Sequence, residues 1–312
     1  MQLEKFFSLY SEEEKCKLFF KEQRESQGIK CKKCGATTHF WIESQSKWQC
    51  KQCKYRTGFN YGTVMENSNL GYRVWLWALY LTSATKKGFS ALEMQRLIGH
   101  KRYEPIWLLM HKIRITMGHR DDKYKLTTFI EMDEGFFEGH RKKADELCEG
   151  RQPKELDRQV KAVVAVSTTP VPIEKQKKGR PKTYPGYLKM NVVSSLNKQE
   201  VTYDAAQMVQ KSATVLTDGK RCYTGLQKIC EVHKAVIVKD KKRVSEVFPW
   251  VHIAISNVKK KILGLHHHVK DEYMQNYLSE FCYKFNRRKP GINLFEKLTT
   301  AALASSWYKS YA

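Results

Sequence analysis

Two strand-like runs end in acidic residues that together could hold a divalent cation. The stretch 125–140 reads as a strand whose apolar positions lead to Asp133 and Glu134, where we expect the strand to end. The stretch 213–219 is a second β-rich run, which ends at Asp218 and can turn sharply at Gly219. A carboxylate at the end of a buried strand is costly unless it is paired or binds a metal. We therefore predict a divalent-cation site of Asp133 and Asp218, with an acidic turn as the alternative for Asp133. Glu134 could assist this site, but we interpret it as a turn residue.

A helix after the last strand is the usual source of a third oxygen ligand in a two-metal phosphoryl-transfer site. The segment 252–264 reads HIAISNVKKKILG and contains no carboxylate. It does contain Asn257, whose amide oxygen can ligate Mg²⁺, and the basic residues that follow it are Lys259 and Lys260. Taken alone, Asn257 is much more typical of an ordinary helix start than of a metal ligand. His252 reads either as a neighbour of the site or as a core histidine.

Four cysteines near the N-terminus have the spacing of a zinc site. Two C-x-x-C pairs are separated by fifteen residues and comprise Cys31, Cys34, Cys50 and Cys53. Each pair fits a tight turn, so that four thiolates converge on one tetrahedral ion. We predict a zinc ribbon with one structural Zn²⁺, and four unlinked free thiols are the alternative.

The order of the remaining elements predicts an α/β fold of the RNase H-like type. Strands are expected at 125–133, 160–167 and 187–196, then at 213–218 and 234–239, with helices at 204–210 and 220–230 and at the C-terminus. This order gives three consecutive strands, then a strand–helix–strand unit, then helices. It is the order found in RNase H-like domains, which consist of a mixed sheet flanked by helices. Residues 138–159 read as a charged connection.

Helical patterns surround the zinc-ribbon segment. Residues 1–30 are expected to be helical, with a capping box from Ser11 to Glu14, and a second box runs from Ser90 to Glu93. The second box opens a helix that is linked through Gly99 to another, a pattern that fits a helix-turn-helix and a plain helical bundle equally well, and basic residues nearby favour DNA contact. The residues there that we expect to contact DNA are Lys101, Arg102, Lys112 and Arg114.

The overall charge indicates a polyanionic partner. The 312 residues include 56 Lys and Arg against 32 Asp and Glu, a formal net charge of +24. Nucleic acid fits this charge better than an anionic membrane, because no basic amphipathic segment with a lipid anchor is evident. No signal peptide is expected, the apolar run 74–81 is too short to span a bilayer, and the cysteine pattern indicates a reducing cytoplasm.

Three further arginines are candidates for DNA contact. Arg180 lies in the basic segment KKGRPK, which reads either as a minor-groove arm or as a solvated basic loop. Arg287 and Arg288 follow an aromatic stripe at helical spacing over 273–285, which we interpret as core. Both arginines are expected to meet backbone phosphate.

Taken together, these motifs resemble bacterial insertion-sequence transposases that join a zinc ribbon to an RNase H-like domain with an Asp-Asp-Asn-Lys signature, the group numbered fifteen ninety-five. The matching segments run in family order over about residues 20–290. After the cysteine ribbon they read NYGTVMENSNL, KGFSALEMQRLIG, EMDEGFFEG, LTDGKRCYTGL, HIAISNVKKKILGLHHHV and YLSEFCYKFNRR.

This resemblance implies a DNA transposase that binds terminal inverted repeats and catalyses cleavage and strand transfer by two-metal phosphoryl transfer. The implied active-site residues are Asp133, Asp218, Asn257 and Lys259, with Lys260 the next choice for the lysine. Two Mg²⁺ ions are implied, with Mn²⁺ as a substitute. Double-stranded DNA, a homodimer on paired ends and a cytoplasmic, nucleoid-associated setting complete the expectation.

Five segments are predicted along the chain. They are an N-terminal helical segment (1–30), the zinc ribbon (31–62), a helical DNA-binding region (63–122), the RNase H-like catalytic domain (123–290) and a C-terminal tail (291–312). The rival function is a catalytically inactive zinc-ribbon DNA-binding protein on the same fold. A third alternative is an RNA-processing nuclease.

Overall fold

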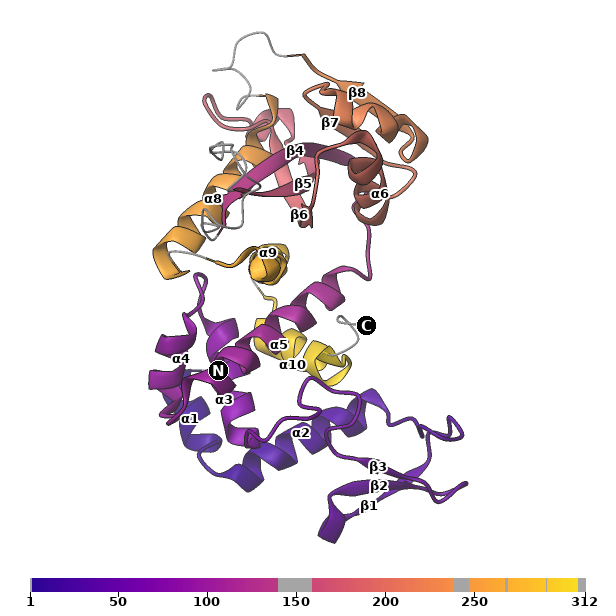
Figure 1. Cartoon of the computed structure of the whole chain (residues 1–312), viewed down its shortest axis with the longest axis vertical. Helices are drawn as coiled ribbons and strands as arrows, with labels where there is room; N and C mark the ends of the chain where they lie inside the picture. Colours follow the sequence, from indigo (N-terminus) through magenta and orange to yellow (C-terminus); the bar gives the residue numbers. More distant parts are fainter. Residues whose placement is uncertain (1, 140–158, 238–246, 267–268, 290, 308–312) are drawn as a thin grey trace, which may run out of the picture. The chain divides into compact units, whose positions relative to one another are not determined.

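The computed structural model describes residues 2–139, 159–237, 247–266, 269–289 and 291–307. It divides into two compact units (Figure 1): unit 1 comprises Met1–His119 and Gly291–Ala312, and unit 2 comprises Arg120–Pro290. The five-segment division predicted above is finer than this partition and stays a prediction. Most of the predicted connection 138–159 lies outside the described residues.

Unit 1 combines a small antiparallel sheet with helices. The sheet has the order β1-β2-β3, from β1 (His39–Ile42), β2 (Lys47–Cys50) and β3 (Arg56–Gly58), with the short helix η1 (Glu43–Gln45) between the first two strands. Trp48 is buried in this sheet and stacks on Phe59. The helices are α1 (Leu3–Leu9), α2 (Glu13–Gln27), α3 (Tyr72–Ala84), α4 (Ala91–Ile98), α10 (Leu294–Leu303) and most of α5 (Tyr103–Asp121).

One of the two predicted capping boxes is confirmed. Ser90 accepts a hydrogen bond from the Glu93 amide at the start of α4, which ends at Gly99 with a positive φ of 73°. The box at Ser11 is wrong, because that hydroxyl donates to the carbonyl of Ser8 and α2 begins later, at Glu13. The Glu13 carboxylate instead accepts hydrogen bonds from the first amides of α3.

Unit 2 is built on a five-stranded mixed sheet. Its order is β6-β5-β4-β7-β8, and the strands are β4 (Phe129–Glu138), β5 (Gln159–Pro170), β6 (Thr183–Val193), β7 (Thr214–Thr217) and β8 (Val232–Ala235). The first three strands pair antiparallel, whereas β7 and β8 run parallel to β4. This confirms the predicted RNase H-like mixed sheet.

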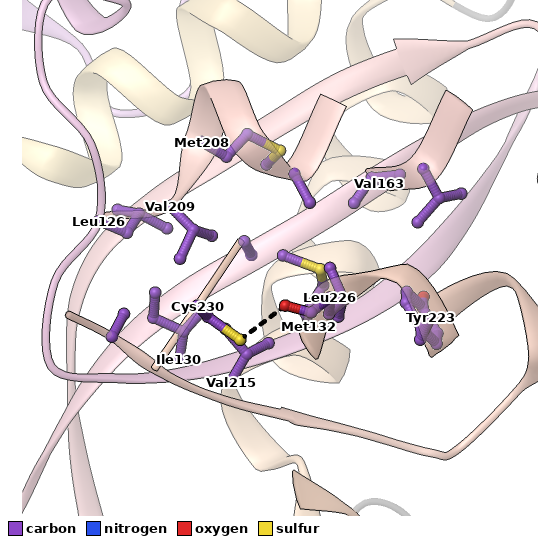
Figure 2. Close-up of a cluster of buried hydrophobic side chains, with 14 of the residues drawn as sticks. Leu126, Ile130, Met132, Val163, Met208, Val209, Val215, Tyr223, Leu226 and Cys230 are labelled. Carbon is purple, nitrogen blue, oxygen red and sulfur yellow. Dashed lines mark hydrogen bonds between the residues drawn. The ribbon is translucent and has the colours of Figure 1, made fainter. Parts of the chain in front are cut away.

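Helices cover both faces of that sheet (Figure 1). On one face, side chains of α6 (Lys198–Met208) and the 3₁₀ helix η5 (Arg221–Lys228) pack on Ile130, Met132 and Val163 (Figure 2). On the other face, α8 (Pro249–His266) and α9 (Met274–Asn286) pack on Val164 and its neighbours. The short helices η4 (Ile173–Lys175) and η7 (Asp271–Tyr273) complete the unit.

The boundaries of several elements differ from the prediction. Strand β4 does not end at Asp133 but runs on to Glu138, because β5 pairs with it along its whole length. Helix α6 starts six residues earlier than expected, where Asn197 accepts a hydrogen bond from the Glu200 amide. The segment after Asp218 is a 3₁₀ helix, and β8 begins two residues before its predicted start.

Candidate metal centre

Strand pairing places Asp133 and Asp218 side by side. The parallel ladder between β4 and β7 ends with the pair Glu131 and Leu216, and each aspartate lies two residues farther along its strand direction. Asp133 is therefore internal to β4 but lies just past the end of its pairing with β7. The two aspartates therefore meet at the end of β7. They do not meet at the end of β4, where the sequence analysis placed Asp133.

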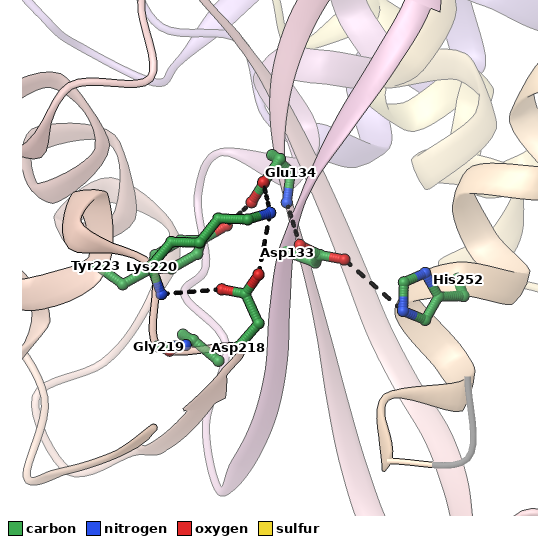
Figure 3. A network of polar contacts seen from close by, with 8 residues as sticks. Asp133, Glu134, Asp218, Gly219, Lys220, Tyr223 and His252 are labelled. Carbon is green, nitrogen blue, oxygen red and sulfur yellow. Dashed lines mark hydrogen bonds and ion pairs between the residues drawn. The ribbon is translucent and has the colours of Figure 1, made fainter. Parts of the chain in front are cut away.

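Three carboxylates meet at this point (Figure 3). One oxygen from each of Asp133, Glu134 and Asp218 lies within 4.8 Å of the others, a grouping that could hold a metal ion. Glu134 is buried, and its amide donates to Asp133 Oδ1 over 2.9 Å. The Tyr223 hydroxyl donates to Glu134 Oε2 over 2.7 Å. Glu134 is therefore part of the cluster and not the turn residue that we expected.

Lys220 is the cation that the structure places among these carboxylates. Its ammonium pairs with Glu134 and lies 3.0 Å from Asp218 Oδ2, while its amide donates to Asp218 Oδ1 over 3.1 Å. Gly219 allows this return of the chain, because its φ is +80°, a region that residues with a side chain rarely adopt. The predicted sharp exit after Asp218 is confirmed.

Burial works against ionisation of both aspartates. It raises the pKa of Asp133, and the positive charges of Lys220 and His252 act in the opposite direction. It also raises the pKa of Asp218, where the Lys220 amide opposes the rise and the charge of Asp133 adds to it. Half-buried carboxylates that repel one another are stabilised by a shared cation, so the donor set fits a divalent metal.

Helix α8 is attached to β4 by a buried carboxylate that our sequence reasoning missed. Glu131 Oε2 accepts hydrogen bonds from the amides of Trp250 (2.9 Å) and Val251 (3.2 Å) in the first turn of α8. Burial raises the pKa of Glu131 to about 7, although both amides oppose the rise. The available signal was spacing, since Glu131 and Asp133 share one face of a strand.

The structure brings His252 to this site. His252 Nε2 lies 3.7 Å from Asp133 Oδ2 (Figure 3). Asn257 is exposed on α8, five residues later, and Lys259 and Lys260 are exposed as well. Lys261 instead pairs with Glu280 of α9 at 3.0 Å, which fixes its side chain.

The four cysteines of unit 1 form a second cluster that fits a zinc ribbon. Their sulfurs lie within 4.8 Å of one another, and the closest pairs join the two C-x-x-C turns, Cys31 with Cys53 at 3.4 Å and Cys34 with Cys50 at 3.6 Å. The backbone amides of Cys34 and Lys33 lower the pKa of Cys31 to about 6. Amides of the second turn likewise lower the pKa of Cys50. Such turns favour thiolates, the form that binds zinc.

Burial removes some basic residues from the predicted DNA-contact set. Lys112 and Arg114 are each 2% exposed, and the Lys112 ammonium lies over the Trp307 ring. Arg287 pairs with Asp121 at 2.7 Å and stacks on the Tyr283 ring. These three stabilise their own units, so we withdraw them.

The other predicted contact residues are exposed. Lys101 and Arg102 precede α5, and Arg180 lies in the loop between β5 and β6. Arg288 is also exposed, although its guanidinium donates to the carbonyls of Pro185 and Gly186. Its remaining donors can still reach a phosphate.

Comparison with known protein families matches residues 125–286 to the ISXO2-like transposase domain. No curated protein matches the chain. Among the described helices, none has both the length and the apolar character that crossing a bilayer requires.

Proposed function

The chain belongs to the ISXO2-like transposase family, whose domain spans just over half of its 312 residues, and we propose that it cleaves and joins DNA as an insertion-sequence transposase. Its substrates would be the terminal inverted repeats of its own element and a target duplex. The reaction would be metal-dependent phosphoryl transfer, carried out by two chains on paired ends.

One observation carries this proposal. Asp133 and Glu134 of β4 and Asp218, directly after β7, each supply an oxygen to one group within 4.8 Å, although Asp218 lies more than eighty positions from the other two along the chain. Asp133 and Asp218 would hold divalent cations, Mg²⁺ or Mn²⁺, with Glu134 beside them. Bound cations there would polarise the scissile phosphate and stabilise the leaving oxygen.

The residues of the chain position the reactants. Asp133 and Asp218 lie next to each other because their strands pair in parallel, and Tyr223 and Lys220 hold Glu134 in place. In cleavage, a water oxygen attacks the phosphorus in line and the 3′ oxygen leaves with a proton. In joining, that 3′ hydroxyl loses its proton and attacks a target phosphate, and the 3′ oxygen of the target strand leaves and takes up a proton. Lys259, exposed on α8, would bind a phosphate near the reacting one.

Unit 1 would supply DNA binding. Cys31, Cys34, Cys50 and Cys53 would hold one structural Zn²⁺, because a closed set of four thiolates leaves no position for a reactant. The exposed basic residues that we retain as phosphate contacts are Lys101, Arg102, Arg180, Lys259, Lys260 and Arg288. Their contacts would make binding strongly dependent on salt.

Replacing either aspartate tests the proposal. Asp133→Asn or Asp218→Asn should reduce cleavage of the element's end DNA by at least about a thousandfold, since each removes a charged metal ligand. End binding should persist, because these residues do not hold DNA. Cleavage is measured on labelled end duplexes with Mg²⁺ or Mn²⁺, and binding by mobility shift.

Asp204→Asn is the matched control, because this half-buried aspartate of α6 lies outside the cluster. It should cleave at the wild-type rate. Cleavage retained in both cluster variants would refute the catalytic assignment. Wild-type protein that binds ends but never cuts them would favour the inactive DNA-binding alternative, and faster cutting of RNA would favour the nuclease.

A further inference from the structure

We infer that the loop between β5 and β6, residues 171–182, binds the minor groove of A·T-rich DNA, with Arg180 in the groove and Ile173 as a wedge between base pairs. The inference deepens the proposed function and rests on it for its partner, DNA, but it requires neither a metal ion nor cleavage. In the proposed function Arg180 contacts a phosphate, whereas here its guanidinium lies in the groove between the two phosphate backbones.

The base of this loop is fixed in unit 2 by hydrogen bonds. The amide of Val171, which is buried, donates to the Lys182 carbonyl over 2.8 Å. Beside this pair, the Trp250 indole donates to the carbonyl and the hydroxyl of Thr183 at 2.9 and 3.0 Å. The amide of the same Trp250 donates to Glu131 of β4. The loop is therefore attached to the strand that carries the acidic cluster, and its place relative to that cluster is set.

Beyond its base, the loop is exposed and basic. Residues 172–180 and Lys182 are all exposed. Residues 173–182 include one acidic side chain, Glu174, and five basic ones, which are Lys175, Lys177, Lys178, Arg180 and Lys182. Within the part of the chain that the structure describes, the side chains of Lys177, Lys178 and Arg180 form no hydrogen bond or ion pair. Their charges are therefore available to an external polyanion.

A tight turn presents Arg180 to solvent. The Arg180 amide donates to the Lys177 carbonyl over 3.2 Å, and Gly179 before it has a φ of +74°, which residues with a side chain rarely adopt. Pro181 follows directly, and a proline disfavours helical backbone in the residue before it. An exposed arginine on such a backbone suits the narrow minor groove of A·T-rich DNA, where the negative potential is enhanced.

Ile173 is an exposed apolar side chain among these charges. It is 86% exposed, at the start of η4 and directly after Pro172. The backbone there is held, because the Lys175 amide donates to the Pro172 carbonyl and the Gln176 amide group donates to the Val171 carbonyl. A single exposed apolar residue is ordinary by itself. Its combination with a groove-binding arginine is what minor-groove proteins use, since they insert apolar wedges between base steps.

The two side chains lie at matching positions in the loop. Ile173 is two residues after Val171, and Arg180 is two residues before Lys182, to which Val171 is hydrogen-bonded. Two residues span at most about 7 Å, so both side chains begin close to the base of the loop. Base pairs rise by about 3.4 Å each. Both residues can therefore reach one groove within a few base pairs.

The ladder of β4 and β5 relates the loop to the acidic cluster. Asp133 pairs with Val164, and β5 continues for six residues to Pro170. At about 3.3 Å per residue, this is roughly 20 Å along the strand. A straight duplex that contacts both places therefore spans at least about six base pairs between them. The A·T-rich steps that the loop prefers should lie at about this distance from the cleaved phosphate.

Binding of short duplexes by the full chain, without added divalent cations, tests the inference. Three duplexes of equal length have centres of A·T, G·C or I·C pairs. Inosine lacks the amino group that guanine places in the minor groove, and it leaves the major groove as in G·C. We expect the A·T and I·C duplexes to bind about tenfold more tightly than the G·C duplex. Energy transfer between dyes at the two ends should show that the bound A·T duplex is bent.

Substitutions in the loop separate the two roles. Arg180→Lys keeps the charge but replaces the planar guanidinium with a more strongly hydrated ammonium. It should reduce the A·T preference to less than about twofold, while the dependence of binding on salt stays the same. Ile173→Ser should keep the preference and abolish the bend. Tyr203→Ser is the matched control, because this side chain of α6 is 70% exposed outside the loop, and it should behave as the wild type does.

Equal affinity for the three duplexes would refute the inference. An I·C duplex that binds like the G·C duplex would also refute it, because the A·T preference would then come from the major groove. A preference that persists in Arg180→Lys, or a bend that persists in Ile173→Ser, would refute the role given to that residue.

These results are distinct from a failure of the proposed function. A protein that prefers and bends A·T-rich DNA but never cleaves its element's ends with Mg²⁺ would lose the catalytic assignment and keep the loop assignment. A protein that cleaves those ends but binds the three duplexes equally would keep the first and lose the second. A protein that binds no duplex would lose both.

Discussion

The protein has two clusters of side chains that could hold a metal ion, and they differ in almost every respect. The thiol cluster of unit 1 comes from two tight turns within 23 residues of sequence, Cys31–Cys53. The acidic cluster of unit 2 joins residues 85 positions apart, counted from Asp133 to Asp218, on two strands that pair in parallel. The first cluster is a set of four like donors, whereas the second combines three carboxylates with the ammonium of Lys220.

The two clusters also stabilise their charges differently. In the ribbon, neutral backbone amides of the C-x-x-C turns lower the pKa of Cys31 and of Cys50. At the sheet, burial raises the pKa of Asp133 and of Asp218, and a side-chain cation, Lys220, lies between carboxylates. The thiol cluster is thus prepared by the local backbone, whereas the acidic cluster depends on charges that the fold brings together.

The largest effect is expected at the thiol cluster. Cys50→Ser should abolish stoichiometric zinc binding and unfold the small sheet β1–β3, since a four-thiolate zinc site contributes on the order of 10 kcal/mol to such a fold. Zinc content is measured by elemental analysis, and loss of structure by hydrogen exchange over residues 39–58. Mn²⁺ binding by unit 2 should remain unchanged.

Cys222→Ser is the control for that experiment, because this thiol belongs to unit 2 and lies outside the cysteine cluster. It should retain one zinc per chain. A Cys50→Ser protein that keeps its zinc, or that loses Mn²⁺ binding together with zinc, would break the comparison between two independent sites.

A smaller effect is expected at Lys220. Lys220→Met removes the ammonium that pairs with Glu134 and Asp218. A metal cation then no longer has to displace that ammonium from the carboxylates. Mn²⁺ affinity should rise by about three- to tenfold, a range set by the partial exposure of the lysine. Calorimetry on the full chain measures this change.

Lys228→Met, an exposed lysine at the end of η5, should leave the Mn²⁺ affinity as it is. A fall in affinity in Lys220→Met would show that Lys220 orients the carboxylates for the metal and does not compete with it. Lys220 would then prepare the acidic cluster for a metal, as the backbone amides prepare the thiol cluster, and the two clusters would differ less.

The smallest effect concerns a carboxylate outside both clusters. Burial raises the pKa of Asp204 from 3.8 to about 6, although a hydrogen bond from Asn191 opposes the rise. The folded state therefore keeps this proton where the unfolded chain has released it. The free energy of unfolding should fall by roughly 1–3 kcal/mol as the pH rises from about 4 to about 6, and then level off.

Asp204→Asn should remove this part of the pH dependence and leave metal binding unchanged. Urea unfolding at several pH values measures the slope in both proteins. An identical slope would mean that Asp204 does not titrate differently on folding. A change in Mn²⁺ affinity would show that the acidic cluster extends beyond the three carboxylates.

The sequence by itself determined the features that depend on short spacing. The C-x-x-C pairs, the cap at Ser90, the turn at Gly219 and the order of strands and helices along unit 2 could all be predicted, because each follows from local geometry or from the order of apolar runs. The pairing of Asp133 with Asp218 in one site followed from two strand-like runs that each end in an acidic residue.

Tertiary structure alone decided which other side chains surround Asp133 and Asp218. Glu134 belongs to the cluster because Tyr223 and Lys220 reach it from η5 and the turn before it, and Lys112 is buried although its sequence context is that of a basic surface. His252 Nε2 lies 3.7 Å from Asp133 Oδ2, and Glu131 of the same strand accepts hydrogen bonds from the two amides that precede His252 in α8. Such contacts join residues more than eighty positions apart, and their geometry depends on the rotation of one helix, which residue types and spacing do not specify.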